Sequence, residues 1–74
     1  MYAANVWSFD PFQPDRIYRF RLRSTGEIIR GKYVGEKTKG EIMDLQDREY
    51  EFMVDGNARV FIASEIVDPL YVGI

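Results

Sequence analysis

The sequence predicts an all-β fold, namely a small five-stranded antiparallel barrel that follows a short N-terminal arm or helical turn. Apolar and charged residues alternate with a period of two around Gly26, a pattern that suits a half-buried strand and not a helix. Turn signals that contain glycine divide the rest of the chain into further short extended stretches. The 74 residues suffice for one thin core, so we assign residues 1–16 to the arm and residues 17–74 to a single barrel domain.

The first hairpin is expected to turn at Thr25-Gly26, because glycine adopts a positive φ without steric cost. Its first arm has Tyr18, Phe20 and Leu22 in alternation with arginines, and its second arm runs over residues 27–35. If Ser24 lies opposite Glu27, the expected cross-strand pairs are Leu22 with Ile29, Phe20 with Gly31 and Tyr18 with Tyr33. This register puts the apolar side chains on one face, whereas a slip of one residue would bury Arg30.

The other face of this hairpin gathers cations, namely Arg19, Arg21, Arg23, Arg30 and Lys32. Charge is unevenly divided along the chain: residues 1–40 hold eight Lys/Arg and four Asp/Glu, whereas residues 41–74 hold two and eight. An anion-binding face on the first half explains this asymmetry. Pairing of the basic second strand with an acidic third strand, within the sheet or between subunits, also explains it, and we favour this explanation because cross-strand ion pairs are common in small β-proteins.

After a turn at residues 37–40, a third strand is expected over Glu41–Gln46, which brings the extended stretches of the chain to six for a barrel of five strands. A second hairpin is expected over Tyr50–Val54 and Ala58–Ala63, around the three-residue loop Asp55-Gly56-Asn57. Pairing Val54 with Ala58 defines an apolar core face made of Tyr50, Phe52, Val54, Val60 and Ile62. The side chains expected to face away from the core are Glu51, Met53, Arg59 and Phe61.

Ser64-Glu65-Ile66 suits a single 3₁₀ turn, and the last strand is expected over Val67–Val72, where Pro69 is tolerated best at a sheet edge. Apolar residues outside the core face indicate that the protein does not stay monomeric. The predicted oligomer interface consists of Met53, Phe61, Leu70, Tyr71 and Ile74. An edge that pairs with the opposite edge of another copy makes a heterologous contact, which closes into a ring where the rotation allows.

The N-terminal arm is rich in aromatic residues but not periodic. Asp10-Pro11 suits the start of one helical turn, with the aspartate as the cap and the proline at the first helical position. Exposed aromatic arms are costly, so we expect Trp7, Phe9 and Phe12 to cover an open end of the barrel or to dock on a neighbouring copy.

The composition argues against several kinds of site. Without cysteine there is neither a disulfide nor a thiolate metal site, and without histidine the commonest acid–base group and metal ligand is missing. We therefore expect no enzyme activity, no metal site and no cofactor. No apolar run approaches the roughly 20 residues that span a bilayer, and the N-terminus lacks a basic region followed by an apolar stretch. We expect a soluble, cytoplasmic protein with no membrane partner.

The glycine spacing around the first hairpin carries a family resemblance. The residues Phe20-x-Leu22, Gly26, Ile29, Gly31, Tyr33 and Gly35 resemble the first motif of the Sm-like (LSm) proteins, and Val60–Val67 stands in the place of their second motif. In its general character the sequence is most similar to short, divergent Sm-like proteins of marine phages. The resemblance covers residues 17–72 and implies an SH3-like barrel that binds RNA. It also implies that the barrels assemble into a closed homo-oligomeric ring of about five to seven copies through heterologous contacts.

The resemblance does not extend to the uridine pocket of that family. Uridine-binding members carry Asp and Asn in the loop after the second strand and Arg-Gly in the second motif. Here the loop has Lys37, Thr38, Lys39 and Glu41, and Ala63-Ser64 stands in place of Arg-Gly. None of the usual base-binding residues can therefore be assigned to this chain.

Two functions remain open from the sequence. In the first, a ring-forming protein binds RNA or another nucleic acid through the hairpin and loop cations, namely Arg19, Arg21, Arg23, Arg30, Lys32, Lys37 and Lys39. In the second, the barrel is a protein–protein assembly or adaptor module without nucleic-acid binding, and its charges provide complementarity between subunits.

Overall fold

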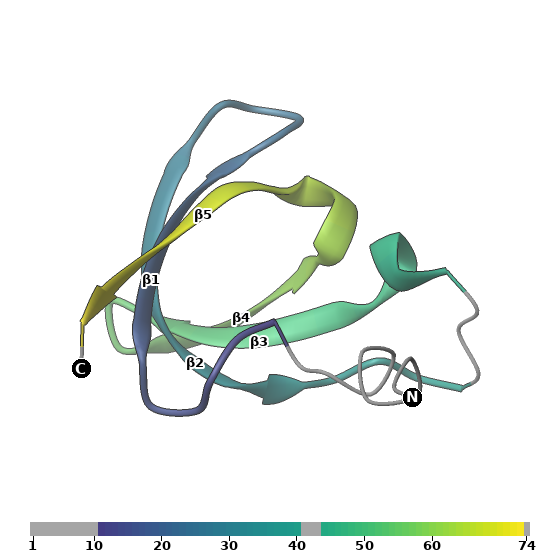
Figure 1. The fold of residues 1–74 in the computed structure, drawn as a ribbon, viewed down its shortest axis with the longest axis horizontal. Coiled ribbons are helices and arrows are strands. Elements are labelled where there is room, and N and C mark those ends of the chain that lie inside the picture. The colour runs from purple at the N-terminus through teal and green to yellow at the C-terminus, as the bar shows by residue number, and fades with distance from the viewer. Residues whose placement is uncertain (1–10, 41–43, 74) are drawn as a thin grey trace, which may run out of the picture.

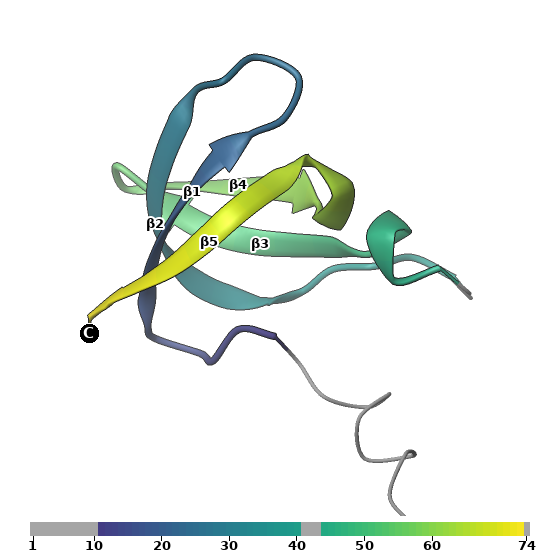
Figure 2. The ribbon, with the colours of Figure 1, turned by 45° about the horizontal axis from the view of Figure 1, so that its top comes forward.

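The computed structural model describes residues 11–40 and 44–73. In chain order the elements are β1 (Ile17–Leu22), β2 (Ile28–Glu36), η1 (Leu45–Asp47), β3 (Glu49–Val54), β4 (Asn57–Ile62), η2 (Ala63–Glu65) and β5 (Ile66–Gly73). The five strands form one antiparallel sheet in the order β4-β3-β2-β1-β5, which curls around the core (Figure 1). The 3₁₀ turn η2 carries the chain from one edge strand to the other (Figure 2). The predicted small all-β barrel is confirmed.

The core is built mainly from aromatic side chains on the inner face of the curled sheet. Its buried members are Phe12, Tyr18, Phe20, Leu22, Ile29, Tyr33, Tyr50, Phe52, Val54 and Phe61. The Phe12 ring comes from the segment before β1, and its centroid lies 5.0–5.4 Å from the centroids of four of these rings. The expectation that Phe12 covers the barrel is confirmed, whereas Trp7, Phe9 and the capping Asp10 lie outside the described residues.

The first hairpin has the predicted faces but a different register. Phe20 lies opposite Ile29, and Tyr18 lies opposite Gly31. The register is therefore two residues away from the predicted one, and a shift of two leaves each side chain on its original face because the strand period is two. The predicted separation of core and surface residues is confirmed, and the predicted pairs are wrong.

The loop of the first hairpin is longer than predicted because its residues bind η2. The Arg23 N–H donates to the Glu65 carbonyl at 2.9 Å, and the Arg23 Nε donates to the Ser64 carbonyl at 2.8 Å. Ser24 donates to the Glu65 carboxylate from its N–H at 3.2 Å and from its hydroxyl at 2.7 Å. These bonds hold Arg23 and Ser24 at η2, so the two residues do not extend β1.

The second hairpin differs from the prediction by one residue, and its faces are therefore exchanged along β4. Val54 lies opposite Asn57, not opposite Ala58. The turn contains only Asp55 and Gly56, at φ of +52° and +81°. This is the pattern of a two-residue type I′ turn, for which Asp-Gly is a preferred sequence.

The exchange of faces moves three large side chains. Phe61 lies opposite Tyr50 and is buried in the core, with 6% of its surface exposed. Val60 and Ile62 instead face outward and are 51% and 44% exposed. The prediction that Phe61 faces away from the core is wrong, and so is the placement of Val60 and Ile62 in the core.

No strand forms in the described part of the predicted third strand. Residues 44–47 make a bend followed by η1, and residues 41–43 lie outside the described residues. The chain after β2 is instead held directly to β3, because the Lys37 N–H donates to the Glu49 carbonyl at 2.8 Å and the Glu49 N–H donates to the Thr38 hydroxyl at 3.0 Å.

The last strand follows the prediction. η2 and β5 form where a 3₁₀ turn and a final strand were expected, and β5 is an edge strand that pairs only with β1 among the described strands. Pro69 lies in a bulge of β5, between the pairs Arg19–Leu70 and Arg21–Val67. A bulge on an edge strand is a place where the missing N–H of proline costs little.

Candidate nucleic-acid interface

Three exposed cations lie together on the outer face of β1 and β2. Arg19 lies directly opposite Arg30, and Lys32 lies opposite Ile17, so that Lys32 is a diagonal neighbour of Arg19. Like charges that lie directly opposite each other on one sheet face destabilise the sheet. We call Arg19, Arg30 and Lys32 the outer cation cluster.

No residue of the outer cation cluster forms an ion pair with a carboxylate in the described part of the chain. The ion pairs there are Arg21–Asp68, Lys37–Glu51, Arg48–Glu36 and Arg59–Glu27, with N–O distances of 3.6, 3.3, 3.4 and 4.0 Å. The sequence left open that an acidic neighbouring strand neutralises the hairpin cations. Within the sheet that explanation is wrong for Lys32, whose partner on β3 is Met53, and no described carboxylate of the chain forms an ion pair with Arg30.

Arg21 lies on the same outer face, beside the cluster. Its only described ion pair is with Asp68, whose side chain is 85% exposed, and such exposed pairs contribute little to stability. A hollow of about 330 Å³ is lined by Arg19, Phe20, Arg21, Ile28, Val67 and Asp68, so it contains the ion-pair partner of Arg21 as well as the two arginines. Of the two arginines at this hollow, Arg19 is the one that forms no ion pair with a described carboxylate.

The other predicted cations lie elsewhere or are already engaged. The Arg23 guanidinium donates to the Ser64 carbonyl at η2. Lys37 is paired with Glu51, whose side chain is only 18% exposed. Lys39 is exposed in the loop that follows β2 and has no described partner. The structure therefore brings together Arg19, Arg21, Arg30 and Lys32 out of the seven predicted cations, and it separates Arg23, Lys37 and Lys39 from them.

The bonds between the hairpin loop and η2 also have an electrostatic consequence. The Ser24 hydroxyl and N–H both donate to the Glu65 carboxylate, and these hydrogen bonds hold the pKa of Glu65 below its ordinary value. Arg23 adds a smaller effect in the same direction. The carboxylate is thus kept charged at the point where η2 is fixed to the β1–β2 hairpin.

Exposed apolar residues lie on the two edge strands, as a site for protein contact requires. Of the predicted interface residues, Met53, Leu70 and Tyr71 are 37%, 54% and 55% exposed, whereas Phe61 is buried and Ile74 lies outside the described residues. The sequence interpretation missed Val60 and Ile62 on β4, which are exposed in place of Phe61. The Asp55-Gly56 pair was the signal that could have identified them, because it favours the two-residue turn.

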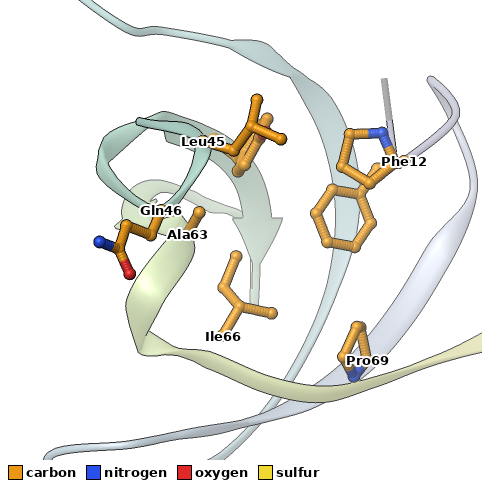
Figure 3. Close-up of a pocket in the computed structure, with 8 residues that line it drawn as sticks. Phe12, Leu45, Gln46, Ala63, Ile66 and Pro69 are labelled. Atoms are coloured by element: carbon orange, nitrogen blue, oxygen red, sulfur yellow. The ribbon is translucent and has the colours of Figure 1, made fainter. Parts of the chain in front are cut away.

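An apolar cavity of about 370 Å³ opens at one end of the barrel. It is lined by Pro11, Phe12, Leu45, Gln46, Tyr50, Ala63, Ile66 and Pro69. Figure 3 shows Phe12 and Pro69 on one side of the cavity and Leu45 and Ala63 on the other. The sequence interpretation did not predict this cavity, because one wall belongs to η1, where a strand was expected.

Neither a metal centre nor a membrane-spanning helix is found in residues 11–40 and 44–73. No group of three or more acidic, histidine or cysteine side chains there is placed to hold a metal ion. The helices of this part of the chain are also too short and too polar to cross a membrane.

Comparison of the chain with models of known protein families, with curated proteins and with solved structures finds no match.

Proposed function

We propose that this protein is a ring-forming, Sm-like RNA-binding protein that contacts RNA phosphates through the outer cation cluster and has no uridine pocket. One observation carries the proposal: Arg19 and Arg30 lie directly opposite each other, beside Lys32, with no carboxylate partner in the described residues. An arrangement that costs stability in the free protein is favourable when an anion lies between the cations.

The expected mode of binding is dominated by the phosphate backbone. Arginine and lysine on a strand face contact phosphates without reading base edges, so binding depends strongly on salt and weakly on sequence. Arg21 shares a hollow with Arg19 and with its own partner Asp68, and it adds to the cluster where a phosphate replaces that exposed carboxylate. The net charge of −2 does not oppose this mode, because the cations are concentrated on one face.

The two sheet edges support the ring. β4 and β5 each have one unpaired side in the described part of the chain, and each carries exposed apolar residues. Pairing β4 of one copy with β5 of the next would satisfy both edges and would repeat the cation cluster around the assembly. A heterologous contact of this kind closes into a ring where the rotation allows, and we propose a ring of about five to seven copies, the size that the Sm-like resemblance implies.

The test is the salt dependence of binding to a fluorescently labelled single-stranded RNA, measured by anisotropy. The wild-type protein should bind at low salt and lose affinity as salt rises. Each of Arg19→Ala, Arg30→Ala and Lys32→Ala should reduce the slope of log affinity against log salt by about 0.7, the value for one phosphate contact on a single strand. The absence of binding at low salt would refute the proposal.

Lys37→Ala and Arg48→Ala are the matched controls. Each removes one positive charge, as the cluster variants do, but from a side chain that is already paired with a carboxylate. The slope should stay near the wild-type value in both. Equal slope losses in the controls and in the cluster variants would show that net charge, and not the cluster, determines the binding.

A protein-binding adaptor is the second candidate function, and the apolar cavity favours it. A cavity of about 370 Å³ is large enough to receive an apolar side chain of a partner, and Leu70 and Val60 are exposed on the edge strands. The mass of the purified assembly and its absorbance at 260 nm discriminate between the candidates. A discrete ring without nucleic acid and without RNA affinity at low salt would favour the adaptor.

A further inference from the structure

A second polar hollow lies where the end of β5 meets the chain before β1. Its volume is about 320 Å³, and it is lined by Gln13, Arg16, Tyr18 and Tyr71. None of these residues belongs to the outer cation cluster. The hollow therefore needs an explanation of its own.

Two tyrosines of unequal exposure form part of the hollow. Tyr71 lies opposite Tyr18 in the β1–β5 register, and the ring centroids are 5.8 Å apart with the planes at 61°. Tyr18 is 8% exposed, and its hydroxyl accepts the Gln13 N–H at 3.0 Å, so its ring is a fixed wall. Tyr71 is 55% exposed, which leaves a large part of its side chain open to a ligand.

Arg16 supplies a planar cation at the same hollow. Its backbone is fixed, since its carbonyl accepts the Tyr33 N–H at 2.9 Å and its own N–H donates to the Gln13 carbonyl at 3.3 Å. Its guanidinium forms no ion pair with a described carboxylate. An accessible aromatic side chain and an uncompensated planar cation are the two groups on which unstacked bases are held in single-stranded nucleic acids.

We propose that Tyr71 and Arg16 form a nucleobase-binding subsite, with the base stacked on Tyr71. The inference rests on the proposed RNA binding and adds a base contact to the phosphate contacts. Stacking tolerates any base because every base has a π face, so the subsite adds affinity with little sequence preference.

The β1–β5 register places the base subsite and the outer cation cluster on opposite faces of the sheet. Leu70, the residue before Tyr71, lies opposite Arg19, so the two neighbours on β5 are associated with opposite faces of the sheet. Because the proposed ring pairs this edge with β4 of the next copy, the RNA does not cross the edge, and the base at Tyr71 belongs to a segment of RNA on the opposite face of the sheet from the cluster. Edge pairing in the ring uses backbone groups, whereas side chains stand away from the sheet plane, so we assign Tyr71 to the base and keep Leu70 at the interface.

The first test isolates the base. AMP is titrated into the protein while the tyrosine ring resonances are followed by NMR, with ribose 5-phosphate as the control that has the sugar and phosphate but no base. AMP should shift the Tyr71 ring resonances saturably, and ribose 5-phosphate should leave them in place. Equal shifts with both compounds, or no shift with AMP at millimolar concentration, would overturn the subsite.

The second test uses single-stranded RNA and the salt slope. Tyr71→Ala should weaken binding about tenfold at every salt concentration with an unchanged slope, because stacking releases no counterions. Tyr71→Phe keeps the ring and should bind as the wild type does. A Tyr71→Ala protein with wild-type affinity would overturn the subsite.

The two proposals fail in different ways. If Arg30→Ala reduces the salt slope and Tyr71→Ala changes nothing, RNA binding by the cluster stands and the base subsite is wrong. If RNA does not bind at low salt but AMP still shifts the Tyr71 resonances, the cluster is wrong and the base subsite stands.

Discussion

The two hairpins of the barrel differ in how a register error propagates to the surface. In the β1–β2 hairpin the observed register lies two residues from the one expected from the sequence, and every side chain keeps its face. In the β3–β4 hairpin the difference is one residue, and Phe61 exchanges places with Val60 and Ile62. Hydrophobic alternation strongly determines which side chains face the core, because a shift of one residue exchanges the two faces of a strand. It determines the length of the loop only weakly, because a shift of two residues leaves the faces unchanged.

The second hairpin shows what alternation alone cannot decide. Val60, Phe61 and Ile62 are all apolar, so either parity of β4 offers apolar side chains to the core. The turn then decides, and Asp55-Gly56 favours two residues with positive φ. In β1 the flanking arginines exclude the other parity, since it would bury several charges.

The largest expected effect on stability comes from a substitution at Phe61, the core residue of β4. Phe61→Ala should lower the free energy of unfolding by about 3–5 kcal/mol, because it removes a buried aromatic ring. Val60→Ala should change it by about 0.5 kcal/mol or less, as is usual for an exposed position. Urea denaturation of the two variants measures both values, and a larger loss in Val60→Ala would favour the register expected from the sequence.

An intermediate effect is expected at the contact between the two hairpins. A Cβ on Gly31 would lie 2.9 Å from Val54 Cγ2 and 3.0 Å from the Met53 carbonyl oxygen. Gly31→Ala should therefore destabilise the protein by about 1–3 kcal/mol, the usual cost of overpacking. Gly35→Ala is the matched control on the same strand, because a Cβ there meets nothing within 4 Å.

The thermal midpoints of Gly31→Ala and Gly35→Ala compare the two positions directly. A midpoint of Gly31→Ala equal to that of Gly35→Ala would show that β3 does not approach β2 as closely as the structure has it.

The smallest stability effect concerns the bonds that fix the first hairpin loop to η2. The pKa of Glu65 is lowered in the folded protein by the Ser24 hydrogen bonds, so its contribution to stability is present above the ordinary carboxyl pKa and is lost as pH falls through the lowered value. Glu65→Gln should therefore be less stable than the wild type near neutral pH, and the difference should shrink on acidification. Thermal melts across this pH range give the difference, and a gap that widens toward low pH would contradict the assignment.

The fold could be predicted from the sequence because alternation and glycine positions specify strands and turns locally. The barrel, the faces of β1 and β2, the 3₁₀ turn η2 and the edge position of Pro69 were all accessible in this way. The 3₁₀ turn η1 could not be predicted, because Glu41–Gln46 has the pattern of an extended strand. That pattern does not indicate the hydrogen bonds that join Lys37 and Thr38 to Glu49.

The candidate site could be predicted from the sequence only in part. The sequence places Arg19 and Arg30 on one face, but which cations are neutralised depends on partners far along the chain. Lys37 pairs with Glu51 although the loop sequence makes it look free, whereas Lys32 lies beside Met53 although an acidic partner was expected. The hollow at Tyr71 depends on the β1–β5 register, which no local pattern encodes.

The most direct test of the outer cation cluster is the thermal midpoint of Arg30→Gln, measured with and without single-stranded RNA. Opposed like charges cost about 0.2–1 kcal/mol, so removing one should raise the midpoint of the free protein. For a domain of this size 1 kcal/mol corresponds to about 4–8 °C, and we expect a rise of about 1–8 °C.

RNA should raise the midpoint of Arg30→Gln by less than it raises the midpoint of the wild-type protein, because one phosphate contact is missing. A free Arg30→Gln protein that melts below the wild type, together with an unchanged shift on adding RNA, would contradict the central claim that Arg19 and Arg30 are held opposite each other for an anionic ligand.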